Sequence, residues 1–362
     1  MFSAAKLYCR RILGRLRRTI KYHIPHRFLA RRIPLQTERL IIFLTPGYQV
    51  RSGGVMAITA MYEESRAMRE LHGSEVVLCT IPGQPLLLKY TWFENRNYLL
   101  SLEAVFRRCG PLDYLLLHIP EYVVNQVSEW LSNSTALLQK VKELHLNVML
   151  FNIDCVQGQN VRALTRFGKV TCTTAHEAYS DLATREAVGV PLHRLLICKG
   201  PEFYSPTTYQ DKEPLLIVSP DPHPLKELVL QKIAKELPEL RIQIIRDLSY
   251  EDYTSLIRRA KWSLTFGEGM DGFFVEPVFS GGVSFAVFNE RFFTPSFTKL
   301  ETVYPSWTDL IDSLVEDLQR LDEPTIYNRC WRQAHDLLSD HLDTERFREN
   351  LRMFYRGEYT FR

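Results

Sequence analysis

Two glutamates, Glu268 and Glu276, stand eight positions apart in the segment Phe266–Pro277. Glu268 precedes a glycine turn, and Glu276 lies inside the short helix that this segment is expected to enter. At this spacing both carboxylates can face one ligand without neighbouring each other. Carboxylate oxygens accept hydrogen bonds from sugar hydroxyls, so the pair is predicted to bind a sugar-containing ligand. An ordinary solvated helix start is the alternative, because two glutamates at this separation are common by chance.

Glycines surround the two glutamates and give the backbone there unusual conformational freedom. Gly267, Gly269 and Gly272 allow positive φ angles and a close approach of the main chain to a ligand. The amides of Phe273 and Phe274, at the expected helix start, are predicted to be free to hold an anion. A diphosphate has the charge and size for such a position.

Strands and helices must alternate along the chain to position this segment. Short apolar runs, typical of strands covered on both faces, occur at 40–44, 75–80, 114–117, 147–151, 170–173, 215–218, 241–245, 262–266 and 283–288. Helical patterns occur at 55–71, 225–237, 251–260, 307–321 and 345–355. The alternation predicts an α/β protein with two doubly wound, Rossmann-like domains facing one another across a cleft. Ligands of such sheets bind beyond the carboxyl ends of the strands.

A polar, proline-rich stretch from 199 to 214 is typical of a linker and sets the expected domain boundary. We expect four parts. They are a basic amphipathic tail at 1–37, a first domain at 38–200, a second domain at 201–340 and a carboxyl-terminal helix at 341–362 that packs back on the first domain.

Composition excludes several classes of protein. The 362 residues are 45% hydrophobic and 24% charged, the balance of a globular chain with a full core. Neither an apolar run of about 18 residues nor the apolar core of a signal peptide is found, so a cytoplasmic location is expected. The cysteines form no Cys-x-x-Cys pair and are odd in number, which favours a reducing compartment over disulfides or structural zinc; they are Cys9, Cys79, Cys109, Cys155, Cys172, Cys198 and Cys330.

Charge is distributed unevenly within a net value of +3. Residues 1–32 hold ten Lys and Arg and no acid, so the remainder carries 45 − 10 = 35 basic against 42 acidic residues. Apolar residues recur at helical spacing among these cations, as in helices that lie on anionic bilayers. A peripheral position at the inner face of the cytoplasmic membrane is therefore one interpretation, and a disordered or locally packed tail is the other. Nucleic-acid binding is not expected, because no reading module accompanies the cations.

The Phe266–Pro277 segment resembles the E-x7-E signature of retaining glycosyltransferases of the family-four type. Glu268, Gly269, Glu276 and Gly281 fall on positions of the family pattern, whereas residues 270–273 and 277 depart from it. In that family the first glutamate contacts the transferred sugar and the second holds the ribose of the nucleotide. The resemblance thus implies that Glu268 is catalytic and Glu276 binds the donor. It also implies the GT-B fold, with the first domain on the acceptor side and the second on the donor side.

The same resemblance implies how the donor diphosphate is held. The residues expected at the donor, besides Glu276, are Gly272, Phe273, Phe274 and Lys226. Lys226 stands where the family has a lysine, but Asp221 stands where the family has an arginine. Because a carboxylate repels a diphosphate, four explanations are open. Either His223 or Arg246 supplies the missing charge, or the alignment is shifted, or the donor site has decayed.

Two positions in the first domain also resemble family features. Gly53 and Gly54 follow the first strand, as does the family's glycine loop that approaches donor and acceptor, although a structural turn would look the same. His118 is expected just past a strand end, where relatives often carry a histidine near the acceptor, and is the second candidate catalytic residue. A satisfied polar group is the alternative for His118.

The implied reaction moves a sugar from a nucleotide diphosphate sugar to a glycan or lipid-linked acceptor with retention, as in surface polysaccharide synthesis. The sugar nucleotide is a co-substrate, no separate cofactor is expected, and the lack of an Asp-x-Asp motif argues against a metal. The alternatives are a catalytically inactive sugar-nucleotide or glycan-binding GT-B protein, a GT-B epimerase and a phosphorylase. A dehydrogenase is disfavoured because no Gly-x-Gly-x-x-Gly follows a strand.

Overall fold

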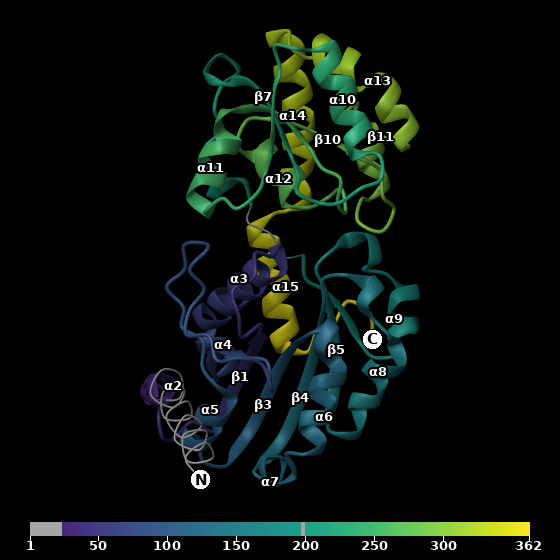
Figure 1. The fold of residues 1–362 in the computed structure, drawn as a ribbon. Coiled ribbons are helices and arrows are strands. Elements are labelled where there is room, and N and C mark those ends of the chain that lie inside the picture. The colour runs from purple at the N-terminus through teal and green to yellow at the C-terminus, as the bar shows by residue number, and fades with distance from the viewer. Residues whose placement is uncertain (1–23, 197–199) are drawn as a thin grey trace, which may run out of the picture. The chain divides into compact units, whose positions relative to one another are not determined.

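A computed structural model describes residues 24–196 and 200–362, which form two compact units (Figure 1). Unit 1 holds the residues up to Ala175, Ser180–Leu195 and Arg348–Arg362. Unit 2 holds His176–Tyr179 and Leu196–Phe347. After a brief excursion at 176–179, the chain passes from unit 1 to unit 2 between residues 195 and 196 and returns to unit 1 between residues 347 and 348. The sequence led us to expect these boundaries at 200/201 and 340/341.

Unit 1 contains a parallel six-stranded sheet in the order β2-β1-β3-β4-β5-β6. Its strands are β1 (Arg39–Thr45), β2 (Glu75–Thr80), β3 (Leu112–Pro120), β4 (Val141–Leu150), β5 (Lys169–Thr174) and β6 (Leu192–Arg194). Its helices are α2 (Ile24–Ala30), α3 (Gly53–Ala67), α4 (Arg69–His72), α5 (Leu102–Arg108), α6 (Val124–Ser132), α7 (Thr135–Leu138), α8 (Gly158–Ala163), α9 (Leu182–Val188) and most of α15 (Thr344–Arg356).

Unit 2 contains a parallel five-stranded sheet in the order β11-β10-β9-β7-β8. Its strands are β7 (Glu213–Val218), β8 (Arg241–Ile244), β9 (Ala260–Leu264), β10 (Val283–Val287) and β11 (Val303–Tyr304). Its helices are α10 (Lys226–Glu236), α11 (Tyr250–Arg259), α12 (Gly272–Phe279), α13 (Trp307–Arg320) and α14 (Pro324–His341).

Along the described residues, 24–196 and 200–362, no helix is long and apolar enough to cross a bilayer.

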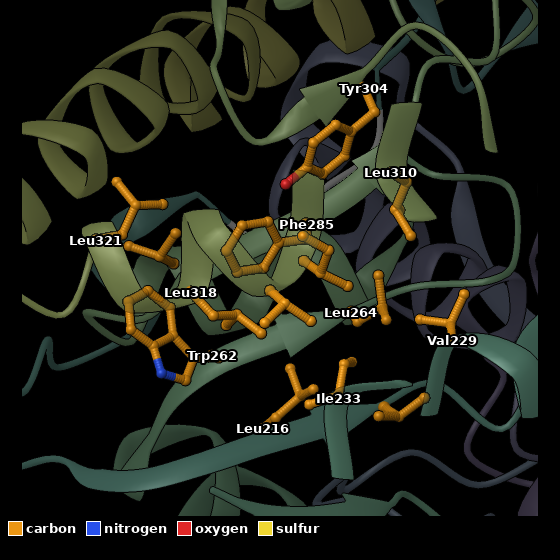
Figure 2. Close-up of a cluster of buried hydrophobic side chains, with 14 of the residues drawn as sticks. Leu216, Val229, Ile233, Trp262, Leu264, Phe285, Tyr304, Leu310, Leu318 and Leu321 are labelled. Carbon is orange, nitrogen blue, oxygen red and sulfur yellow. The ribbon is translucent and has the colours of Figure 1, made fainter. Parts of the chain in front are cut away.

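Apolar runs form the central strands because helices cover both faces of each sheet. In β7, Leu216 and Val218 face a cluster that α10 and α13 complete, and Figure 2 shows Leu216 among the side chains of this cluster. Leu215 and Ile217 face the opposite side and pack on α11. Each fully buried aliphatic or aromatic side chain contributes about 1.5–3 kcal/mol through the apolar area removed from water.

The structure differs from the sequence-based elements in extent. The helix predicted at 55–71 is divided at Met68 into α3 and α4. Strand β3 reaches Pro120 rather than Leu117, because its last residues pair with Asn147–Met149 of β4. Helix α14 was not predicted, although Glu323 caps it by accepting hydrogen bonds from the amides of Thr325 and Ile326.

Helix α15 covers a row of buried histidines in unit 1. The ring of Phe354 lies 5.5 Å from His118 on β3, 5.9 Å from His145 on β4 and 6.0 Å from His193 on β6. Burial lowers the pKa of all three imidazoles, that of His145 to about 3. These histidines are therefore neutral in the folded protein at neutral pH.

We expect unit 1 to lose stability as the pH falls below about 6.5. An unfolded chain binds a proton at each histidine near pH 6.5, whereas the folded chain does so only below its lowered pKa. Stability is thus present above pH 6.5 and falls by up to about 1.4 kcal/mol per pH unit for each histidine. Urea unfolding between pH 7.5 and 5 measures the slope. His145→Gln should make it shallower, and a flat profile in wild type would contradict this account.

Candidate functional site

The candidate site lies in unit 2 where the strand order changes direction. The strand that follows β7 along the chain, β8, pairs on one side of β7, and β9 pairs on the other. In open parallel sheets the loops that follow two such strands diverge, and ligands bind between them. Here these loops are 219–225 after β7 and 265–271 after β9. They are joined because the amide of Phe266 donates to Ser219 Oγ at 2.9 Å.

The β9 loop carries the glycines singled out in the sequence. Gly269 has φ +92°, and a Cβ there would lie 2.5 Å from the ring of Phe293, so only glycine fits. Gly267 is exposed, and a Cβ there would lie 2.8 Å from Asp221 Oδ2 and 2.9 Å from Asp271 Oδ2. Two carboxylates therefore flank Gly267 from the two loops.

The first turn of α12 is occupied by the protein's own carboxylate. Asp271 Oδ1 accepts hydrogen bonds from the amides of Phe273 at 2.8 Å and Phe274 at 3.1 Å. Its other oxygen, Oδ2, accepts from Thr265 Oγ1 at 2.9 Å. The expectation that these amides are free to hold an anion is wrong, because Asp271 is the N-cap of α12. An Asp directly before a helix start is the sequence signal that pointed to this cap.

Asp271 is also electrostatically strained. Burial, with the nearby charge of Asp221, raises its pKa to about 7, although three hydrogen bonds to its oxygens oppose the rise. Asp221 Oδ2 is buried and has no hydrogen-bond partner among the described residues. It is therefore unfavourable for the carboxyl groups of Asp221 and Asp271 to be ionised at the same time.

Glu268 precedes the N-cap residue Asp271 in the chain, and Glu276 follows it within α12. Burial and the charge of Asp221 raise the pKa of Glu268, which is partly buried. Glu276 folds back over the helix start, and its Oε1 is 3.1 Å from the position that a Cβ of Gly272 would take. The hydroxyl of Tyr250, at the start of α11, donates to Glu276 Oε2 at 3.5 Å. Tyr250 is a polar neighbour that the sequence did not indicate.

Lys226, at the start of α10, ties the β7 loop together. Its ammonium group donates to the carbonyl oxygens of Ser219 and of Asp221, the latter at 3.0 Å. An ammonium has three N–H donors, so one remains for a ligand. Burial lowers the pKa of Lys226, and Arg246 adds to this effect while Asp221 opposes it.

Of the two residues considered as substitutes for the missing arginine charge, His223 does not fit. Its Nδ1 accepts a hydrogen bond from the amide of Leu225 at 3.2 Å, and its ring stacks on Trp307 at 3.9 Å. Burial lowers the pKa of His223, so it is neutral at pH 7. Arg246, in the loop between β8 and α11, is exposed and lies near enough to Lys226 to lower its pKa. Arg246 is the remaining candidate for the second cation.

The corresponding position in unit 1 is the loop after β1, where the strand order also changes direction. Gly53 and Gly54 begin α3 at this point, and the N-cap Ser52 makes no side-chain hydrogen bond to the helix. A Cβ added to Gly53 would meet no atom within 4 Å. Packing within the described residues therefore does not require glycine at 53.

His118 is not where the sequence led us to expect it. It lies within β3 rather than past its end, and its side chain is 0% exposed. Its Nδ1 pairs with Asn147 Nδ2 at 3.0 Å, and its ring stacks on Phe43 at 4.1 Å. Because strand β3 is longer than predicted and α15 covers it, His118 is a buried core residue. The interpretation of His118 as catalytic is therefore withdrawn.

A pocket of about 670 Å³ opens in unit 1 beside the carboxyl end of β2. Its walls are mainly apolar and include Trp130, Leu102 and the loop 81–87. Gln84 holds this loop by accepting from the amide of Gly47 at 2.9 Å. None of the residues predicted for the site lines the pocket. Among residues 24–196 and 200–362, no group of three or more His, Cys, Asp and Glu side chains is arranged to hold a metal ion.

Comparison with known proteins gives structural matches only. The sequence matches no protein-family model and no curated protein. Sucrose-phosphate synthase from Thermosynechococcus elongatus matches with a TM-score of 0.54 at 9% identity, over 88% of this chain and 98% of that chain. α,α-Trehalose 6-phosphate synthase from Burkholderia multivorans matches with a TM-score of 0.51 at 9% identity, over 88% and 99%.

A third matching structure is a complex with a ligand. Anabaena Alr3699/HepE, solved in complex with UDP-glucose, has a TM-score of 0.50 at 10% identity, over 88% of this chain and 99% of that chain. These similarities extend over both units, and the sheets of both units are parallel and doubly wound. The chain has the α/β architecture of the GT-B glycosyltransferases.

Proposed function

We propose that this protein is a retaining glycosyltransferase that moves a sugar from a nucleotide diphosphate sugar to a glycan or lipid-linked acceptor, in the synthesis of a surface polysaccharide. One observation carries the proposal. Glu268 lies in the glycine loop after β9 and Glu276 lies in the helix α12 that follows it, at the point of the unit 2 sheet where the strand order changes direction.

Each side chain has a role in this proposal. Glu276 accepts hydrogen bonds from the ribose hydroxyls, and Glu268 accepts them from the transferred sugar. In this proposal the third N–H of Lys226 and the guanidinium of Arg246 bind the diphosphate. Two cations near the leaving group stabilise the negative charge that grows on it.

The reaction breaks the bond between the anomeric carbon and the diphosphate oxygen. The acceptor oxygen forms a bond to the same carbon on the same face, which retains the configuration. The acceptor hydroxyl loses its proton to the departing phosphate oxygen, because this oxygen becomes more basic as negative charge accumulates on it. No step in this scheme requires a metal, and unchanged turnover in EDTA is the expected result.

A second function is favoured by Asp221 and Asp271. Their carboxylates flank Gly267 in the loop that is proposed to receive the diphosphate, and Asp271 holds the two amides at the start of α12. A catalytically inactive protein that binds a sugar nucleotide or a glycan would tolerate them. This alternative predicts that the ligand binds but is not converted to product.

We place the reaction in the cytoplasm. Among the described residues the cysteines are free thiols; they are Cys79, Cys109, Cys155, Cys172 and Cys330. Free thiols suit a reducing compartment, where sugar nucleotides are also available to the enzyme.

The test is a panel of nucleotide diphosphate sugars, with binding measured by saturation-transfer NMR and calorimetry. We expect one nucleotide class to bind and the nucleotide diphosphate to be released when an acceptor is added. Binding without release in a broad acceptor screen would favour the inactive binding protein. Release of a changed sugar without any acceptor would indicate an epimerase, and failure of every donor to bind would overturn both assignments.

A further inference from the structure

A surface of unit 1 outside the candidate site combines exposed apolar side chains with arginines. We call it the α2 surface, and it consists of Ile24, Arg27, Phe28, Arg31, Arg32 and Leu35. The apolar members are exposed by 52% at Ile24, 65% at Phe28 and 66% at Leu35. Large apolar side chains that gather on a surface mark a site of interaction.

The rest of unit 1 holds this segment in place. The opposite side of α2 is buried through His26 and Ala30, and α2 packs against α5. At the end of α5, Arg108 donates through Nε to the carbonyl of Ile33 at 2.9 Å, and Thr37 Oγ1 donates to the carbonyl of Pro34 at 2.8 Å. The outward side chains are thus presented by a packed element, in agreement with the locally packed alternative for this part of the basic tail.

The α2 surface is strongly positive. Its three arginines are all exposed, and the first acid along the chain is Glu38. Residues 1–32 carry ten cations and no acid, whereas the remainder of the chain has 35 basic and 42 acidic residues. The positive charge is therefore concentrated at this end of a chain that is otherwise negative.

We infer that the α2 surface binds an anionic lipid bilayer. Ile24 and Phe28 lie four residues apart on one helix face, so both can enter the boundary between headgroups and acyl chains. Arg27, Arg31 and Arg32 then meet lipid phosphates, which a guanidinium binds with two parallel hydrogen bonds. A nucleic acid would satisfy the arginines but would leave Ile24 and Leu35 in water. The inference does not depend on the proposed transferase activity.

Flotation of the full-length protein with vesicles tests this inference. We expect binding to vesicles of 70% phosphatidylcholine and 30% phosphatidylglycerol, little binding to pure phosphatidylcholine, and weakening with added salt. The Arg31→Glu/Arg32→Glu variant should lose at least about thirtyfold in affinity, since each cation near the surface is worth about 1 kcal/mol. The Phe28→Ser/Leu35→Ser variant should also lose binding.

Matched controls separate this surface from general charge or hydrophobicity. Arg329→Glu/Arg332→Glu makes the same charge change on α14, and Leu182→Ser/Leu228→Ser removes exposed leucines elsewhere, so both should bind like wild type. Thermal melting checks that all variants fold. Wild-type binding by Arg31→Glu/Arg32→Glu, equal binding to both vesicle types, or preferred binding to RNA would overturn the inference. So would a Phe28→Ser/Leu35→Ser variant that changes only the oligomeric state.

Discussion

Replacing Glu276 by alanine is expected to lower the affinity for the nucleotide diphosphate sugar about a hundredfold. A carboxylate that accepts from both ribose hydroxyls makes two charge-assisted hydrogen bonds of about 1.5 kcal/mol each, and their loss corresponds to that factor. Glu276 is partly exposed, so stability should change little, and thermal melting of the variant checks this. Calorimetry of the donor that binds to wild type measures the effect.

Two further variants make this result specific. Glu236→Ala, on the exposed side of α10, removes the same charge from unit 2 and should leave the affinity unchanged. Glu268→Gln should lower kcat while it changes the donor Kd less than Glu276→Ala does, because Glu268 is proposed to act on the transferred sugar. Unchanged donor binding in Glu276→Ala would contradict the proposal that the donor binds at the E-x7-E segment.

Replacing Asp271 by asparagine is expected to strengthen donor binding about tenfold at pH 8. At a separation of about 5 Å and an effective dielectric constant of about 20, a charged carboxylate would oppose a phosphate by roughly 3 kcal/mol. The donor is therefore expected to bind the form in which Asp271 is neutral, and asparagine removes the cost of that protonation, which is about tenfold at pH 8. Asparagine still caps a helix, so α12 should keep its start. Asp271→Gly goes further, because it also frees the amides of Phe273 and Phe274, at a cost of a few tenths of a kcal/mol in the cap.

The pH dependence of wild type should follow from the same carboxyl group. The pKa of Asp271 is raised to about 7, so it is mostly neutral at pH 6 and mostly charged at pH 8. Donor binding should therefore tighten about tenfold between pH 8 and pH 6, and in Asp271→Asn this dependence should vanish. The groups that face Asp271 are Asp221, Thr265 and Tyr253.

Stability provides an independent measure of this group. A carboxyl whose pKa is raised on folding stabilises the fold below its ordinary pKa of 3.8, and this contribution is lost as the pH rises through about 7. Asp271→Asn should thus be more stable than wild type at pH 8, and Asp221→Asn should bring the pKa of Asp271 closer to its ordinary value. Equal donor affinity and equal stability of wild type and Asp271→Asn across pH 6–8 would contradict the assignment.

The sequence predicted the fold class because the central strands are buried on both faces. Leu40–Leu44 and Leu215–Val218 contain no polar residue, and a strand with helices on both sides must be apolar throughout. The glycine loop after β9 was equally visible. Positive φ at Gly269 is a local property of the backbone, and glycine is the residue that permits it.

His118 shows what a local pattern does not contain. A histidine near the end of an apolar run reads the same whether its ring faces a ligand or a helix. Its burial was decided by α15, which is held to α3 through the pairing of Arg348 with Glu64, residues 284 positions apart in the sequence. A contact between residues so far apart in the sequence produces no local pattern from which it could be predicted.

The sequence by itself determined the parallel α/β units, the glycine loop with Glu268, and Glu276 in the helix after it, because these depend on local spacing and on burial averaged over a strand. Tertiary structure alone decided the electrostatics of the site. It brought Asp221 and Asp271 from two loops to either side of Gly267, and it placed the Asp271 carboxylate on amides expected to be open. Charges interact over distance in space, and the folded chain rather than residue order sets that distance.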